Sequence, residues 1–374
     1  MKRALDVVSF HFVTGAPYND KLLILFSGTD GFVYRMCLGL SQGYSYLVPL
    51  YWRHKNEGRA TNHLMFPLYS AVTRNVLRQP IGGEFAFNGK TLERFTDAEK
   101  WVKGWRDFGI DMGMSITAGT SGDPVGQLLL PRKINYVGDD ARMQVGDIFV
   151  QEGRSLFNGL IDWMESSQFC MTTDLTIAPV VQIEVAQNTN MKVELSENAE
   201  IIAALHSFLV QYSKREFKSS AMDVLGGLFD GIKEAFEDFR ANGLCGVLAW
   251  DRPKAIPQEK QSEFVNQLQS VNRSVFLKSD EWAQVVFKCL KEFQARRIKN
   301  EEKACQAVIR GVLLCVFYLR VLSFNLETLG LPTYPNAEDL LMDQMQEFFQ
   351  VALAYQGNNN TVSSCIAQRE SYQL

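Results

Sequence analysis

The sequence predicts an α/β protein in which a mixed sheet is followed by a mostly helical second half. Short β-prone runs, rich in Gly and aromatic residues, occupy roughly the first 150 residues. Amphipathic helical stripes dominate the remainder. An early strand–helix–strand order is typical of an α/β sheet.

Continuous apolar runs predict strands that are buried on both faces of the sheet. These runs are Leu22 to Phe26, Ser45 to Tyr51, Ile116 to Ala118 and Val125 to Leu130. Apolar residues at helical spacing predict a helix over residues 61–75, between the second and third runs. The last two runs are separated by the Gly-rich turn GTSGD.

Three helical stripes characterise the second half, and each is typical of a helix that packs on a core. They span Ala221 to Phe239, Trp282 to Phe293 and Leu341 to Leu353. We therefore expect a sheet-containing domain over residues 1–160 and a helical domain over 161–356. Residues 357–374 are polar and predict a flexible tail.

Composition narrows the class of protein. Of the 374 residues, 46% are apolar and 21% are charged, which excludes a chain that is disordered throughout. A net charge of −4 gives no global attraction to nucleic acid or an anionic membrane, so we expect neither as a partner. Seven Cys without a CxxC pair indicate free thiols in a reducing compartment. No signal peptide is evident and no apolar run is long enough to span a bilayer, so we expect a cytoplasmic protein.

Two basic clusters are candidates for binding an anion. Arg53, His54, Lys55 and Arg59 lie beside Gly58 and Thr61 in YWRHKNEGRATN. Cations, a hydroxyl and a Gly backbone suit charge-assisted binding of an anion, although a solvated basic loop is the alternative. In LLLPRKIN, Arg132 and Lys133 follow an apolar strand, at the end where α/β sheets bind ligands.

Two acidic positions are candidates for catalysis or sugar binding. Glu84 follows two glycines in RQPIGGEF. Two glycines would let the backbone approach a ligand closely, and the carboxylate would then accept hydrogen bonds from sugar hydroxyls. A plain turn with a structural Glu is the alternative. Asp111 lies among apolar residues and glycines in FGIDMGM. Either Asp111 is buried with a raised pKa or paired with a cation, or it is the N-cap of a helix.

In this order and spacing, these runs resemble one family. The segments YLVPLYWRHKNEGRATN, RQPIGGEFAF, WRDFGIDMGMSITA and GQLLLPRKIN are similar to retaining glycosyltransferases of the GT-A type. The nearest groups are the glucosyl-3-phosphoglycerate, glucosylglycerate and mannosylglycerate synthases. The resemblance extends to FLKSDEWAQVVF, RVLSFNLET and NAEDLLMDQMQEFF in the second half. The resemblance implies a fold with a Rossmann-like GT-A sheet. It also implies an enzyme that transfers a hexose from a sugar nucleotide to glycerate or phosphoglycerate, with retention at the anomeric carbon.

The resemblance also implies roles for single residues. The acceptor would be held by Gly58, Arg59 and Thr61, and the donor sugar nucleotide by Gln79, Gly82, Gly83 and Lys133. Asp111 would lie close to the reacting carbons, with Glu84 as the second catalytic candidate. A homo-oligomer is a further expectation.

A divalent cation, Mg²⁺ or Mn²⁺, is the cofactor that the resemblance implies. The family's metal-binding His corresponds to Asn135, whose amide oxygen is a weaker ligand for a transition metal. No Asp-x-Asp motif precedes Tyr46, and Asp30 is the nearest substitute. We therefore expect a truncated sheet lacking most of the nucleotide-binding half. The alternative function is that of an inactive or truncated homologue acting as a binding or interaction protein.

Overall fold

The computed structural model describes residues 11–13, 22–25, 32–51, 58–97, 105, 108–130, 145–166, 169, 174–181, 277–328 and 335–357. Contacts divide the chain into two compact units. The first contains residues 1–53, 60–188 and 348–374, and the second contains residues 54–59 and 189–347. The domain bounds expected from the sequence stay a prediction, and each unit is described by itself below.

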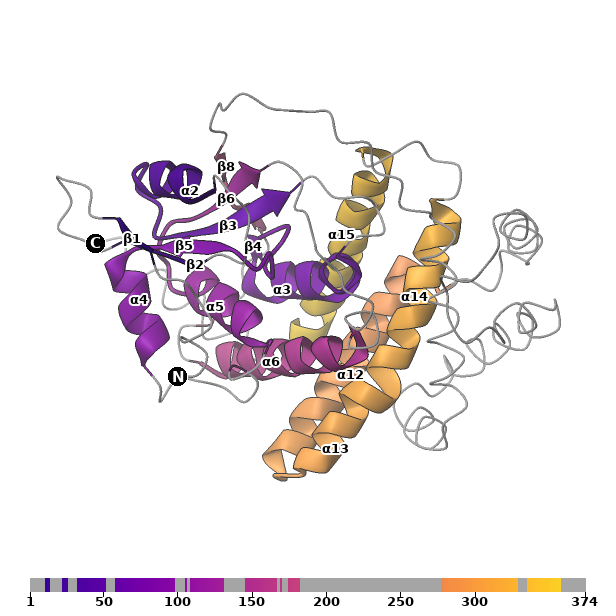
Figure 1. Cartoon of the computed structure of the whole chain (residues 1–374). Helices are drawn as coiled ribbons and strands as arrows, with labels where there is room; N and C mark the ends of the chain where they lie inside the picture. Colours follow the sequence, from indigo (N-terminus) through magenta and orange to yellow (C-terminus); the bar gives the residue numbers. More distant parts are fainter. Residues whose placement is uncertain are drawn as a thin grey trace, which may run out of the picture. The chain divides into compact units, whose positions relative to one another are not determined.

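A mixed sheet forms the centre of the first unit (Figure 1). Its strand order is β1-β2-β5-β3-β6-β8. The bounds are β1 His11–Val13, β2 Leu22–Leu25, β3 Tyr46–Tyr51, β5 Phe85–Phe87, β6 Val125–Leu130 and β8 Val180–Val181. β3, β6 and β8 are parallel, whereas β5 pairs antiparallel with β3 and with β2. The predicted mixed α/β architecture is confirmed at this level.

The parallel pair β3 and β6 is in register over its whole length. Tyr46 pairs with Val125 and Tyr51 pairs with Leu130, so both strands end at the same edge of the sheet. A second, two-stranded sheet pairs β4 (Asn75–Val76) with β7 (Thr176–Ile177). The end of β3 and β6 is the edge at which α/β proteins bind ligands.

Helix α2 (Phe32–Leu40) covers one face of the main sheet (Figure 1). Met36 and Leu40 form a buried cluster with Leu47 and Tyr51 of β3. The cluster also contains Ala86, Leu128, Leu130 and Val181. A Cβ on Gly39 would lie 2.6 Å from Leu47 Cδ1, so this glycine allows the close approach of α2 to β3.

The opposite face is covered by helices α3 (Phe66–Thr73), α4 (Gly89–Thr96), α5 (Ile110–Gly119) and α6 (Val145–Glu165) (Figure 1). Tyr46 of β3 points to this side: its ring stacks on Phe85 with centroids 5.8 Å apart and meets Phe95 of α4 edge-on. Strand residues one position apart alternate between faces. Tyr46 and Tyr51 therefore mark the two faces of β3.

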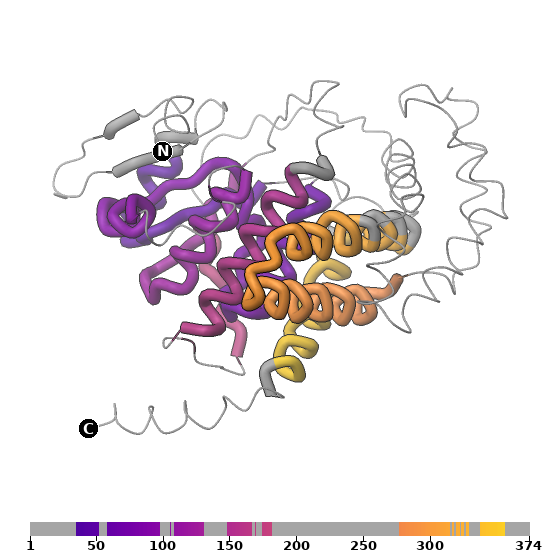
Figure 2. The backbone as a smooth tube through the Cα atoms, turned by 90° about the horizontal axis from the view of Figure 1, so that it is seen from below, coloured from indigo at the N-terminus to yellow at the C-terminus, as the bar shows by residue number. Residues whose placement is uncertain are grey.

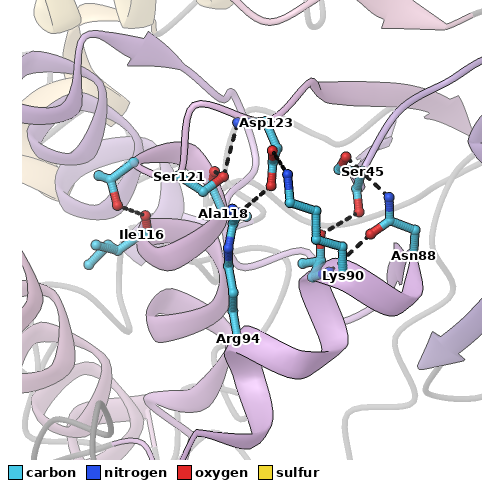
Figure 3. Close-up of polar contacts among 10 residues, drawn as sticks. Ser45, Asn88, Lys90, Arg94, Ile116, Ala118, Ser121 and Asp123 are labelled. Carbon is cyan, nitrogen blue, oxygen red and sulfur yellow. Dashed lines mark hydrogen bonds and ion pairs between the residues drawn. The ribbon is translucent and has the colours of Figure 1, made fainter.

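Helix α4 is fixed at both ends by polar contacts (Figure 3). At its N-cap, Asn88 accepts a 3.0 Å hydrogen bond from Thr91 N and donates a 3.2 Å bond to Ser45 Oγ. Further along, Lys90 and Arg94 both pair with Asp123, in the turn between α5 and β6. The turn GTSGD is thereby anchored to α4.

Residues 61–73 are helical, as predicted, but the first turns are wider than an α-helix. A π-helix, η1 (Thr61–Met65), runs into α3, which ends at Arg74 with a left-handed φ of 65°. The strand predicted over residues 116–118 is wrong, because these residues belong to α5. Most of α5 is buried, and a short apolar run that is buried all round does not distinguish a strand from a helix.

The second unit contains the helices α12 (Ser279–Ile298), α13 (Glu302–Ala307), η6 (Val308–Leu313, a π-helix) and α14 (Leu314–Glu327). α12 and α14 run side by side in the tube view (Figure 2). α15 (Pro335–Gly357) begins in this unit. The helices predicted from the stripes at 282–293 and 341–353 are confirmed, whereas the stripe at 221–239 lies outside the described residues. None of the helices that the structure describes has the length and apolarity to cross a membrane.

One buried arginine joins three of these helices. Arg320 of α14 is 0% exposed and donates to Glu327 at 2.7 and 3.0 Å. It also donates to Gln344 Oε1 of α15 at 2.8 Å. At the start of α12 it reaches the Leu277 carbonyl at 2.9 Å and Ser279 Oγ at 3.1 Å. The guanidinium is thus compensated by a carboxylate and by hydrogen bonds, as a buried charge requires.

Candidate functional site

The loop between β4 and β5 is fastened to the end of β3 by a side-chain amide. Gln79 Nε2 donates a 2.8 Å hydrogen bond to the Tyr51 carbonyl, and Gln79 Oε1 accepts a 3.2 Å bond from Tyr51 N. The amide thus pairs with the last residue of β3 as a neighbouring strand would. Gln79 is 1% exposed, so both hydrogen bonds of its side-chain amide are made in the interior of the protein.

The glycines of this loop allow it to lie against β3 and then turn. A Cβ on Gly82 would fall 2.2 Å from Pro49 Cγ, so any larger residue would push the loop away from the strand. Gly83 has a φ of 86°, which side-chain-bearing residues rarely adopt. Both predicted donor-site glycines therefore have a structural reason to be glycine.

Glu84 is buried next to the end of β3. It immediately precedes β5 and is 1% exposed, and its Oε2 accepts a 2.5 Å hydrogen bond from the Tyr51 hydroxyl. A bond this short is typical of a hydroxyl that donates to a carboxylate. Glu84 and Gln79 thus both converge on Tyr51.

Asp111 lies in the first turn of α5, two residues after the N-cap Gly109, so it is not itself the N-cap. Helix α6 holds this turn from the side. Ser155 Oγ donates a 2.7 Å hydrogen bond to the Gly109 carbonyl, and Gln151 Oε1 accepts a 3.2 Å bond from Phe108 N. Asp111 is half-buried and therefore accessible to a ligand.

Glu152 of α6 is a candidate that was not singled out from the sequence. It is 7% exposed, and its Oε2 has no hydrogen-bond partner among the described residues. Burial, and then the negative charge of Asp111, raise the pKa of the Glu152 carboxyl well above its usual range. Burial foremost, with a contribution from Asp111, also raises the pKa of the Tyr46 hydroxyl. Asp111, Glu152 and Tyr46 therefore share one electrostatic environment.

The sequence does carry a signal for Glu152. It lies three residues after Phe149 and four before Leu156, and both of these are 0% exposed. A Glu on the apolar stripe of an amphipathic helix has to be buried, and a buried acid is expected to have a perturbed pKa.

The candidate residues form two groups connected by one serine. Tyr51 and Glu84 meet on the α2 side of the sheet, whereas Asp111 and Glu152 belong to helices on the other side. Between them, Ser115 Oγ donates a 2.5 Å hydrogen bond to the Pro80 carbonyl, next to Gln79. Ser115 Oγ also lies 3.1 Å from the Tyr46 hydroxyl.

Of the three residues expected to hold the acceptor, Gly58, Arg59 and Thr61, only Thr61 belongs to the first unit. Thr61 begins η1 and is 3% exposed. The neighbouring Asn62 Oδ1 accepts a 3.0 Å hydrogen bond from Arg78 Nη2, which ties η1 to the start of the Gly-rich loop. Gly58, with a φ of 66°, and Arg59 belong to the second unit.

Three predicted site residues, Asp30, Lys133 and Asn135, lie outside the described residues. The single cavity expected around Arg59, Glu84, Asp111 and Lys133 therefore stays a prediction. Within the described part of the chain, no three His, Cys, Asp or Glu side chains are grouped to hold a metal ion. The divalent cation that the resemblance implies therefore stays a prediction.

The chain was compared with known protein families and with curated proteins. No family matches it, and no curated protein matches it. The functional argument therefore rests on the quoted sequence motifs and on the geometry of their described residues.

Proposed function

We propose that this protein is a hexosyltransferase that uses a sugar nucleotide as donor and a small acid, glycerate or phosphoglycerate, as acceptor, with retention at the anomeric carbon. The proposal is supported by the convergence of the motif segments near the carboxyl end of β3. Gln79 fastens the Gly-rich loop to Tyr51, Arg78 links that loop to η1, and Ser115 links it to α5. Segments separated by long stretches of sequence thus meet at the Gly-rich loop, which is fastened to the carboxyl end of β3, the end at which α/β sheets bind ligands.

In the proposed reaction, the bond between the anomeric carbon and the diphosphate oxygen breaks. A bond to the acceptor hydroxyl oxygen forms, and the hydroxyl proton passes to the departing phosphate. The half-buried carboxylate of Asp111 is suited to stabilise the positive charge that develops at the anomeric carbon, since fixed charges act strongly at a site with little water. Glu84 is enclosed by the fold, so in this proposal it shapes the site through Tyr51.

The test is a panel of nucleotide sugars, with glycerate and phosphoglycerate as acceptors, assayed with Mg²⁺ and with Mn²⁺. Asp111→Asn is expected to lower turnover by about 10²–10³, the cost of removing one electrostatic group from a transition state. Asp339→Asn, at an exposed acid on α15, is the matched control and is expected to leave turnover unchanged. Absence of glycosylated product and of donor binding across the panel would overturn the proposal.

A second candidate is a non-catalytic protein that keeps this fold and binds a ligand or partner. It is favoured by the internal use of the loop's polar groups: Gln79 and Glu84 are each 1% exposed and bonded to Tyr51. In this case Glu84→Gln lowers the thermal melting temperature, while wild type and Asp111→Asn are equally inactive. Turnover by wild type that is lost in Asp111→Asn would reject this candidate.

A further inference from the structure

The acid pair formed by Asp111 and Glu152 has a feature that the proposed function does not use. Glu152 is buried on α6, with one oxygen that no described group satisfies, whereas Asp111 is half-buried. A buried polar atom without a partner is rare in folded proteins and calls for a physical account. A second ionised carboxylate beside Asp111 would also repel the diphosphate of a sugar nucleotide.

We propose that Glu152 is the positioning residue of Asp111 and acts by remaining uncharged, so that the pair presents a single negative charge to an anionic ligand. This inference rests on the proposed function only for the identity of that ligand. It names a role for Glu152 that the sequence motifs do not assign.

The geometry of α6 supports this role. Gln151 and Ser155, on either side of Glu152, hold the backbone of Phe108 and Gly109 at the start of α5. The same stretch of α6 therefore fixes the turn that carries Asp111 and supplies its acidic neighbour. Gly113, one turn beyond Gly109, packs so closely on Trp105 that a Cβ there would lie 2.1 Å from the indole ring. The turn around Asp111 is thus held from two directions.

The other titratable groups near α6 are not among the charges that raise the pKa of Glu152. The described elements that pack on α6 also carry Tyr69 on α3, Arg74 at the end of α3 and His63 in η1. Among the described residues, Asp111 is the charge that acts on Glu152, and it acts together with burial to favour the protonated carboxyl. A carboxyl with a raised pKa is uncharged below that pKa and becomes charged as the pH rises through it. Repulsion of an anionic ligand is therefore expected to appear on the alkaline side.

The first experiment measures the proton without any ligand. Infrared difference spectra of wild type against Glu152→Gln at neutral pH are expected to contain the C=O band of a protonated carboxyl. In Asp111→Asn, this band is expected to titrate at a lower pH than in wild type, because the charge of Asp111 adds to burial in raising the pKa of Glu152. The control, Glu165→Gln, replaces an exposed acid on the same helix and is expected to leave the protonated-carboxyl band of Glu152 in place. Absence of the protonated band, or an unchanged midpoint in Asp111→Asn, would overturn the inference.

The second experiment measures binding of UDP-glucose, GDP-glucose and GDP-mannose between neutral and alkaline pH. Once the Glu152 carboxyl ionises at high pH, wild type is expected to bind the nucleotide sugar about tenfold more weakly. Glu152→Gln is expected to keep its affinity, because its amide cannot ionise. Parallel pH profiles of wild type and Glu152→Gln would refute the role of Glu152. If no donor binds any variant, the proposed function fails, while the infrared result still decides whether the acid pair holds a proton. Thermal melting of each variant separates unfolding from loss of binding.

Discussion

Replacing Arg320 by Met tests how the helices of the second unit are held together. Methionine keeps much of the aliphatic length of the side chain and removes the guanidinium. Five hydrogen bonds are lost with it, to Glu327 twice, to Gln344, to the Leu277 carbonyl and to Ser279. The cost depends on how well each abandoned partner is solvated.

The partners differ in burial. The Glu327 side chain is 27% exposed, so its carboxylate is rehydrated in part once the arginine is gone. Gln344 is 0% exposed and loses the donor that Arg320 gives it, as does the carbonyl of Leu277. Removing one partner of a buried ion pair costs about 3–5 kcal/mol in the free energy of unfolding, and we expect Arg320→Met to fall in this range. That is a large share of the ~5–15 kcal/mol that stabilises a typical protein.

The measurement is urea denaturation followed by circular dichroism, combined with hydrogen exchange in α12 and α14. Arg296→Met is the matched control. Arg296 also pairs with two carboxylates, Glu292 at 2.6 Å and Glu301 at 3.0 Å, but its side chain is 36% exposed. Exposed ion pairs contribute little, so this control is expected to be nearly neutral. A loss for Arg320→Met no larger than for Arg296→Met would refute the reasoning, and so would increased exchange confined to elements that Arg320 does not touch.

Two further predictions concern the first unit. Gly113→Ala is expected to destabilise the protein by about 1–3 kcal/mol in urea denaturation despite the higher helix propensity of Ala, because the new Cβ overlaps the Trp105 ring; a neutral or stabilising change would contradict the packing. Burial acts to raise the pKa of Asp123, but the hydrogen bond from Lys90 and the charge of Arg94 outweigh it, and the net pKa is lowered. The carboxylate therefore stabilises the fold above its unfolded pKa of about 3.9, and this contribution is lost as the pH falls through the lowered value. Acid melting curves of wild type and Asp123→Asn are expected to converge at low pH, and a constant separation between them would be inconsistent with this titration.

The strands at the centre of the sheet were predictable because their chemistry is simple. β3 is a continuous apolar run and β6 is apolar except at Gln127, and a strand buried on both faces is typically of this kind. Their parallel pairing and the insertion of β5 beside β3 are set by contacts distant in sequence, such as the bonds from Gln79 to Tyr51. An apolar pattern does not report those contacts. Residues 116–118, near the end of α5, were predicted as a strand because most of this helix is buried, and an apolar run of this kind does not distinguish a helix from a strand.

The candidate site was predictable to the extent that its residues are unusual for their local surroundings. Asp111 stands out as an acid among apolar residues, and its negative charge acts together with burial to raise the pKa of a second acid, Glu152. Glu152 was missed because no helix was predicted over residues 145–165, so its position on the apolar stripe with Phe149 and Leu156 was not recognised. Glu84 was expected to face a sugar, and its hydroxyl partner is instead Tyr51. Which oxygen satisfies a buried carboxylate depends on tertiary packing and does not follow from spacing along the chain.

The sequence segments quoted from the second half are joined by contacts that do not involve a substrate. The segment RVLSFNLET supplies Arg320 and Glu327, FLKSDEWAQVVF supplies Leu277 and Ser279, and NAEDLLMDQMQEFF supplies Gln344. Arg320 joins all three segments through its hydrogen bonds. A buried arginine constrains the residues around it because each of its donors has to be satisfied in the interior. The packing of the helices accounts for these contacts without a ligand. The case for sugar transfer accordingly depends on the first unit, and above all on what Asp111 and its acidic neighbour do when a donor is present.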